Sequence, residues 1–80
     1  MTVRLRVFAI LRERLGASEI ERTAGPRTTV GAIWRAVVAE HPEVARVRVR
    51  FAVKEAYVDA DYRPKDGDEV AVFPPVSGGA

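Results

Sequence analysis

The residues best suited to chemistry lie at the end of the chain, in the segment VFPPVSGGA at 72–80. Two consecutive prolines at 74–75 fix the dihedral φ and favour an extended path that leads away from a sheet. The glycine pair at 78–79 has no side chains, so an enzyme can close tightly around its backbone. We therefore expect residues 76–80 to form a thin, flexible arm that offers a glycine carboxylate to chemistry performed by another protein.

Other catalytic and metal-binding patterns are weak in this chain. There is no cysteine, and the one histidine, His41, precedes Pro42 at the end of a predicted helix, where we expect it to interact with the helix-end carbonyls. An EF-hand reading that starts at Asp59 fails, because Arg63 and Pro64 occupy the fifth and sixth positions. We therefore predict no metal site and interpret the later acidic residues at 65–68 as a turn.

Composition limits the class of protein. The 80 residues are 48% hydrophobic with a net charge of +2, which indicates a single globular domain. Arginines dominate up to residue 50 and acidic residues crowd the last third, so there is no clustered basic stripe typical of nucleic-acid binding. No apolar stretch approaches the ~20 residues of a membrane span, and the first ten residues do not resemble a signal peptide. We expect a cytoplasmic protein that binds neither nucleic acid nor membrane.

The first third of the chain predicts two strands joined by a short helix. Residues 2–9 alternate between apolar and polar side chains, which is typical of a half-buried strand. A helix of about two turns follows, and Gly16 is its natural stop. Residues 18–25 are expected to form a second strand, paired with the first like a hairpin.

The rest of the chain predicts one long helix and three further strands. Thr28 or Thr29 can cap a helix whose apolar stripe comprises Val30, Ile33, Trp34 and Val37, and Pro42 ends it. Strict alternation predicts a strand at 46–54, a short extended piece at 57–58, and a last strand at 69–73. We expect an α+β fold of the ubiquitin-like β-grasp type, with one main helix on one face of a mixed sheet of four to five strands. The predicted domain is 1–75, followed by the tail at 76–80.

Two phenylalanines break the rule of a polar outer sheet face. Phe8 and Phe73 lie at positions whose alternation points away from the main helix. Exposed aromatic side chains that lie together usually mark a partner surface, although either strand end could instead twist and tuck its ring under a loop. The basic row at 46, 48, 50 and 54 is interpreted as a solvated strand face, with a docking surface for an acidic partner as the alternative.

The segments VRLRVFAILRERLG, TVGAIWRAVVAEHP and DGDEVAVFPPVSGG resemble the MoaD/ThiS family of ubiquitin-like sulfur carriers, and within it the branch of molybdopterin synthase. The resemblance implies that an activating adenylyltransferase adenylates Gly79 with ATP and magnesium, and that the adenylate becomes a thiocarboxylate. It implies that the tail then enters the large subunit of molybdopterin synthase and donates sulfur to cyclic pyranopterin monophosphate. The chain would bind no cofactor and would not be catalytic alone.

The resemblance also implies which residues contact the partners. The family's first-strand aromatic matches Phe8, and the arginine that opens its short helix matches Arg12. Tyr57 stands where the family has an aliphatic residue. The expected partner-binding set is Phe8, Arg12, Tyr57, Phe73, Pro74, Pro75 and Val76, with Gly78 and Gly79 at the reactive end.

Ala80 departs from the family pattern, because it locks the carboxyl group of Gly79 in a peptide bond. A precursor cut by a peptidase, a fusion junction or a cloning remnant would each explain it. Two other functions remain open. The same tail would serve a protein modifier or a sulfur carrier for tRNA or thiazole, whereas an inert tail would leave a plain β-grasp binding module.

Overall fold

The computed structural model describes residues 1–75, and the predicted tail at 76–80 lies outside them. Eight elements follow one another along the chain. They are β1 (Thr2–Val7), α1 (Ile10–Leu15), β2 (Glu19–Thr23), α2 (Val30–Glu40), the 3₁₀ helix η1 (Pro42–Val44), β3 (Arg50–Val53), β4 (Ala56–Val58) and β5 (Glu69–Phe73).

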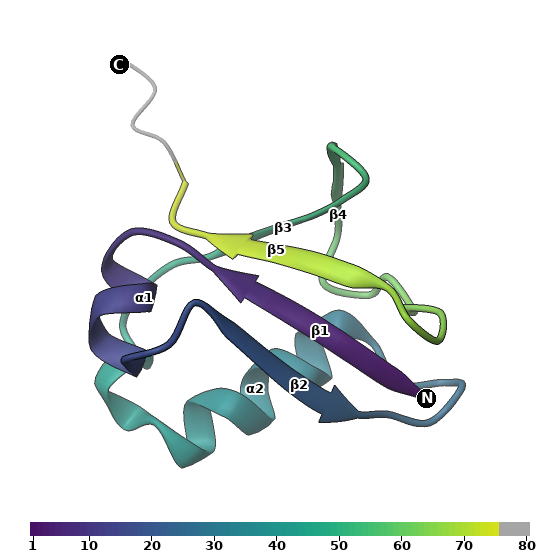
Figure 1. Ribbon diagram of the computed structural model, residues 1–80, viewed down its shortest axis with the longest axis horizontal. Helices are drawn as coiled ribbons and strands as arrows, with labels where there is room; N and C mark the ends of the chain where they lie inside the picture. Colours follow the sequence, from purple (N-terminus) through teal and green to yellow (C-terminus); the bar gives the residue numbers. More distant parts are fainter. Residues whose placement is uncertain (76–80) are drawn as a thin grey trace.

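The strands form one mixed sheet with the order β2-β1-β5-β3-β4. β1 and β5 are parallel neighbours, and the other three pairings are antiparallel. α2 lies across one face of this sheet, and α1 lies at the end towards which both β1 and β5 run (Figure 1). The predicted α+β, β-grasp-like arrangement with one main helix is confirmed, and the sheet has five strands.

A single core fills the space between the sheet and α2. The inward positions of the two central strands, Val3, Leu5 and Val7 on β1 with Val70 and Val72 on β5, are fully buried or nearly so. The apolar stripe of α2 meets them, and Trp34 is buried there as predicted. Each such aliphatic side chain contributes roughly 1.5–3 kcal/mol of hydrophobic stabilisation, so the core holds the sheet and α2 together as one unit.

The caps of α2 explain where the helix begins and ends. The Thr29 hydroxyl accepts a hydrogen bond from the Ala32 N–H at 3.1 Å, which confirms Thr29 as the N-cap. At the other end, the backbone N–H of His41 donates to the carbonyls of Val37 and Val38. The expectation for the His41 ring was wrong in its partner, because the ring Nδ1 lies 3.4 Å from the Glu43 carboxylate instead.

The first predicted strand was too long at its end. β1 stops at Val7, and Ala9 takes a φ of 55°, a left-handed conformation that a strand cannot continue through. The carbonyl of Phe8 already accepts a hydrogen bond from the Leu11 N–H at 3.1 Å. The chain therefore turns into α1 directly after Val7.

The third predicted strand, 46–54, was also wrong at both ends. η1 follows α2 at once, and the Val47 N–H still bonds to the Val44 carbonyl at 3.1 Å, so the turn persists into the predicted strand. Val47 and Val49 pack against the core without ladder pairing. Lys54 and Glu55 form the two-residue loop between β3 and β4, each with positive φ.

The loop between β4 and β5 holds the start of α2. The N–H groups of Val30 and Gly31 donate to the carbonyls of Tyr62 and Ala60, both at 2.8 Å. A Cβ atom on Gly31 would lie 2.9 Å from the Ala60 carbonyl oxygen, so only glycine fits without a shift. Two donors of the first helical turn, which have no partner inside a helix, are satisfied in this way.

The predicted turn at 65–68 is confirmed, and its carboxylates are hydrogen-bond acceptors. Asp66 accepts from the Thr2 N–H at 2.8 Å, and Asp68 accepts from the Lys65 N–H at 2.8 Å and the Tyr62 hydroxyl at 2.9 Å. The bond to Asp68, with smaller contributions from burial and from the carboxylate charge, raises the pKa of Tyr62 above its ordinary value of 10.0. Asp66 thus connects the turn to β1, and Asp68 connects it to Tyr62 earlier in the β4–β5 loop.

Candidate functional site

The sheet face opposite α2 carries charged side chains near the start of β5 and apolar ones near the end of β5. Along one row of the ladder, Arg4 stands between Glu21 and Glu69. In the next row Arg6, Ala71, Ala52 and Tyr57 follow one another across four strands. This outer face therefore has small side chains at its centre and larger ones around them.

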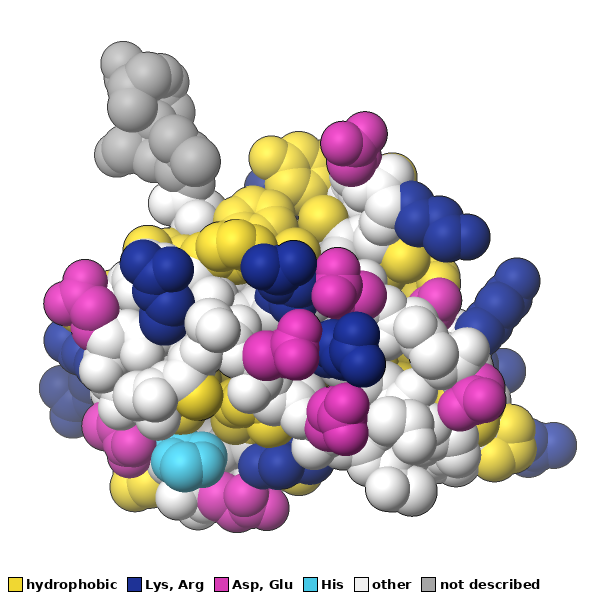
Figure 2. Space-filling view, in the orientation of Figure 1, with side chains coloured by type: hydrophobic (Ala, Val, Ile, Leu, Met, Phe, Trp, Pro, Cys, Tyr) yellow, Lys and Arg dark blue, Asp and Glu magenta, His cyan; other side chains and the backbone are white. Residues whose placement is uncertain are grey.

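Three aromatic side chains lie on this face close to the end of β5. The rings of Tyr57 and Phe73 are in contact, with centroids 5.8 Å apart and planes tilted by 37°. Tyr57 is 66% exposed and Phe8 is 39% exposed, whereas Phe73 is half-buried. Figure 2 shows hydrophobic side chains gathered beside the end of β5, with charged side chains next to them. We call Phe8, Tyr57 and Phe73 the aromatic surface.

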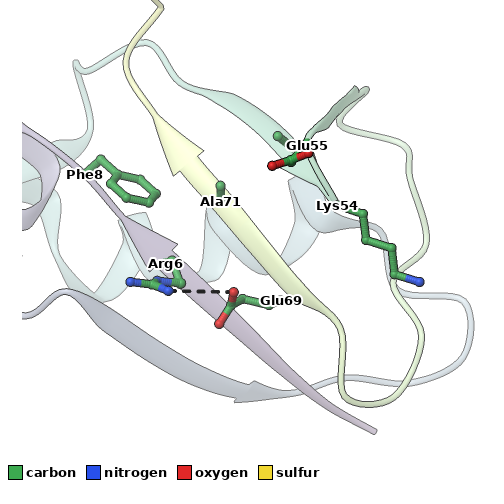
Figure 3. Close-up of a pocket in the computed structure, with 7 residues that line it drawn as sticks. Arg6, Phe8, Lys54, Glu55, Glu69 and Ala71 are labelled. Atoms are coloured by element: carbon green, nitrogen blue, oxygen red, sulfur yellow. Dashed lines mark ion pairs between the residues drawn. The ribbon is translucent and has the colours of Figure 1, made fainter.

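A shallow hollow of about 470 Å³ adjoins the aromatic surface. Ala52 and Ala71 lie between larger neighbours, with Phe8 on one side of β5 and the loop residues Lys54 and Glu55 on the other (Figure 3). The hollow is completed by Arg6 and Glu69, whose charged groups are 3.8 Å apart. A hollow with small apolar residues inside and charges at its edge suits a protruding side chain of another protein.

The structure brings together part of the predicted partner-binding set. Phe8, Tyr57 and Phe73 share the outer face, so the alternative in which Phe8 tucks under a loop is wrong. Pro74 is half-buried and Pro75 exposed directly after β5. Arg12 is exposed on α1, at the same end of the sheet (Figure 1). Val76, Gly78 and Gly79 lie outside the described residues, and the partner-binding roles stay predictions.

The placement of Arg50 was not predicted from the sequence. Its guanidinium carbon lies 4.6 Å from the centre of the Tyr57 ring, a cation–π contact. Both residues alternate outward, but their proximity depends on the short β3–β4 hairpin and its register. The charged rim of the hollow was also missed, because it combines residues of β1, β5 and the Lys54–Glu55 loop.

Residues 1–75 carry neither a metal-binding cluster nor a membrane-spanning helix. No group of three or more His, Asp and Glu side chains there is arranged to hold a metal ion. No helix in that part of the chain is long and apolar enough to cross a membrane.

A family profile and a sequence relative match the chain over nearly all of its length. The profile of the ThiS family matches residues 5–79. A molybdopterin synthase sulfur carrier subunit of Chlamydomonas reinhardtii is 34% identical over 83 residues, which cover 99% of this chain and 100% of the relative. The human protein of the same name is 40% identical over 52 residues, and that match covers 59% of each chain.

Solved structures agree on the fold. SAMP1 of Haloferax volcanii superposes with a TM-score of 0.83 at 28% identity, covering 99% of this chain and 100% of that one. A complex of subunits 1 and 2 of the molybdopterin-converting factor of Helicobacter pylori contains a chain that matches with a TM-score of 0.68 at 24% identity, over 99% of this chain and 100% of that one. The fold, the family profile and the full-length relative agree, and the chain therefore belongs to the ThiS family and is homologous to molybdopterin synthase sulfur carrier subunits.

Proposed function

We propose that this protein is the sulfur-carrier subunit of a molybdopterin synthase and is not catalytic on its own. The observation that carries the proposal is the full-length similarity to a subunit of that name, in a chain whose last strand is followed by two prolines and a glycine pair. Both the fold and the sequence pattern support a globular domain that presents a reactive terminus to other proteins.

The proposed chemistry takes place on the carboxyl group of Gly79. An activating adenylyltransferase transfers AMP from ATP to this carboxylate, and pyrophosphate leaves, in a step that requires magnesium. A sulfur donor of the hydrosulfide class then attacks the acyl carbon and AMP leaves, which produces a thiocarboxylate. In the large synthase subunit the thiocarboxylate sulfur bonds to a carbon of cyclic pyranopterin monophosphate and replaces an oxygen substituent there. Water then hydrolyses the bond between the acyl carbon and sulfur, which regenerates the Gly79 carboxylate. Adenylation is needed because a carboxylate is a poor electrophile without a good leaving group.

The aromatic surface supports the docking part of the proposal. A monomeric soluble protein rarely exposes aromatic side chains together unless another molecule covers them. Phe8 and Tyr57 are exposed beside the end of β5. A protein that encloses the tail would therefore also cover these two side chains. Arg12, Pro74, Pro75 and Val76 are proposed to extend this contact, with Gly78 leading the chain into the partner.

Intact-mass spectrometry tests the proposal directly. The chain ending at Gly79 and the chain ending at Ala80 are each incubated with the activating enzyme, ATP, magnesium and a sulfur donor. We expect the Gly79 form to gain the mass difference between one sulfur and one oxygen atom, and the Ala80 form to stay unchanged because its Gly79 carboxyl is a peptide. A Gly79 form that never gains sulfur would contradict the proposal.

A protein-modifier function is the second candidate, and the likeness to SAMP1, a small archaeal modifier protein, favours it. A modifier forms an amide bond between its terminal glycine and a target lysine, so it appears attached to other proteins. Recovery of conjugates from the native cell, with activation intact and no transfer of sulfur to a pterin, would favour this candidate over the carrier. A sulfur carrier for tRNA or thiazole would instead gain sulfur and pass it to those products.

A further inference from the structure

The three arginines that strands place on the outer face differ in their partners. Arg4 lies 3.4 Å from Glu21 and Arg6 lies 3.8 Å from Glu69. Arg50 is exposed and forms no ion pair with any side chain of residues 1–75. Of these three arginines, the one paired with the last residue of β5 is thus the one whose charge is not matched within residues 1–75.

Arg50 is nevertheless held in place. Its guanidinium carbon lies over the ring of Tyr57, 4.6 Å from the ring centre, and that ring in turn contacts Phe73. The ring lies on one side of the guanidinium, which carries five N–H donors, so donors remain for an acceptor on another molecule. Two parallel N–H donors match the two oxygens of a carboxylate. The contact with Tyr57 therefore holds the guanidinium near this position before any acceptor is bound.

The position of Arg50 relates it to the tail. Arg50 pairs with Phe73 across the ladder, and Phe73 is the last residue of β5 before the two prolines. A protein that encloses the tail and covers the aromatic surface must also remove water from Arg50. A guanidinium that loses water without gaining an acceptor destabilises a complex, whereas one that meets a carboxylate adds specificity.

We propose that Arg50, positioned by Tyr57, is a specificity-determining residue that binds a carboxylate side chain of the large synthase subunit at the entrance for the tail. This inference rests on the proposed function, because it takes the large subunit as the partner. It predicts an acidic side chain on that subunit next to the site where the tail enters.

Binding of the full chain to the purified large subunit, measured by surface plasmon resonance without pterin or nucleotide, tests the inference. Arg50→Met is compared with Arg35→Met, which removes the same charge from the exposed side of α2 in the other layer. We expect Arg50→Met to raise Kd about tenfold or more, as loss of a central interface arginine does, and to lower the salt dependence of association. Arg35→Met should change Kd less than about twofold.

Two further variants separate geometry from charge. Arg50→Lys keeps the charge but has no planar fork, so it should retain the salt dependence and still bind several-fold more weakly. Tyr57→Leu keeps an apolar side chain and removes the cation–π contact, and we expect weaker binding with a faster dissociation rate. Thermal melts of all four variants verify that each one is folded.

Each alternative outcome has a distinct meaning. Equal Kd values for Arg50→Met and Arg35→Met would overturn the role of Arg50 and leave the proposed function standing. A loss that appears only when the phosphorylated pterin is present would assign Arg50 to a substrate phosphate, which overturns the carboxylate. No binding of the unsubstituted chain to the large subunit, in either its Gly79 or its Ala80 form, would overturn the proposed function together with this inference.

Discussion

Among single residues, Tyr62 shows how one side chain connects separate parts of the chain. Its hydroxyl donates to Asp68 at 2.9 Å, and its backbone carbonyl accepts from the first turn of α2. The sequence suggests neither contact, because Tyr62 belongs to a stretch without periodicity. A tyrosine that donates to a carboxylate keeps its proton more firmly, which is why its pKa is raised.

Replacing Tyr62 by phenylalanine should change how stability depends on alkaline pH. In the folded state the pKa of Tyr62 lies above its unfolded value of 10.0. The hydrogen bond to Asp68 therefore contributes fully to the free energy of unfolding below pH 10.0. It is lost as the pH rises through the folded-state pKa. Because the hydroxyl is partly solvated, we expect Tyr62→Phe to lower the free energy of unfolding by about 1 kcal/mol at neutral pH.

Urea titrations of both proteins from about pH 7 to about pH 11 measure this effect. The difference in free energy of unfolding should shrink at the alkaline end. There the unsubstituted protein loses the Tyr62–Asp68 hydrogen bond, which Tyr62→Phe lacks at every pH. A difference that stays constant across the range would show that the Tyr62–Asp68 bond does not cause it.

Among the elements, α2 depends on a loop that is distant in sequence. The carbonyls of Ala60 and Tyr62 satisfy the N–H groups of Gly31 and Val30, so the β4–β5 loop acts as a cap for the helix. A side-chain cap at Thr29 was predictable from the residue type, whereas this backbone cap was not. The close approach requires a residue without a Cβ atom at position 31.

Gly31→Ala should therefore destabilise the protein even though alanine is the better helix former. The added Cβ would lie 2.9 Å from both the Ala60 Cβ and the Ala60 carbonyl oxygen, so the loop must move. We expect a loss of about 1–3 kcal/mol, typical of overpacking, measured by urea denaturation.

Gly25→Ala is the matched control for this prediction. A Cβ at position 25 meets its nearest neighbour, the Thr28 hydroxyl oxygen, at an ordinary 3.6 Å. Its effect should stay within about 0.5 kcal/mol of the unsubstituted protein. If Gly31→Ala were as stable as this control, the loop would not be packed tightly on α2.

For the whole molecule, the first and last strands of the chain, β1 and β5, pair side by side within the sheet. β1 lies between β2 and β5, and the Thr2 carbonyl accepts from the Gly67 N–H at 2.8 Å. The first strand therefore cannot pair fully until the last one is in place. Such non-local pairing favours a single cooperative folding transition, in which the aromatic surface and the core form together.

Leu5→Ala should test this cooperativity, because Leu5 is fully buried on β1, between β2 and β5. Loss of its side chain is expected to lower the free energy of unfolding by about 2–5 kcal/mol, a large share of what a small domain has. The fluorescence of Trp34 and far-UV circular dichroism should report the same midpoint. Thr23→Ala, at an exposed position of β2, serves as the control with little change. Two separate midpoints would contradict a single core.

The local pattern of the sequence determined the elements that have one buried face. Alternation placed Val3, Leu5 and Val7 inward on β1, and the stripe with Trp34 set the buried side of α2. The last strand was predicted with its observed bounds, because a turn precedes it and two prolines follow it. These features depend on period and on residue type, which a sequence displays directly.

Tertiary structure decided where strands stop and which side chains meet. Residues 46–49 alternate like a strand, but η1 and the turn after it remove them from the ladder until Arg50. Phe8 and Phe73 could be placed on one face from alternation alone, whereas the contact of Arg50 with Tyr57 required the register of the β3–β4 hairpin. Contacts between strands depend on sheet order and register, and these are set by the packing of the whole domain and not by any local pattern.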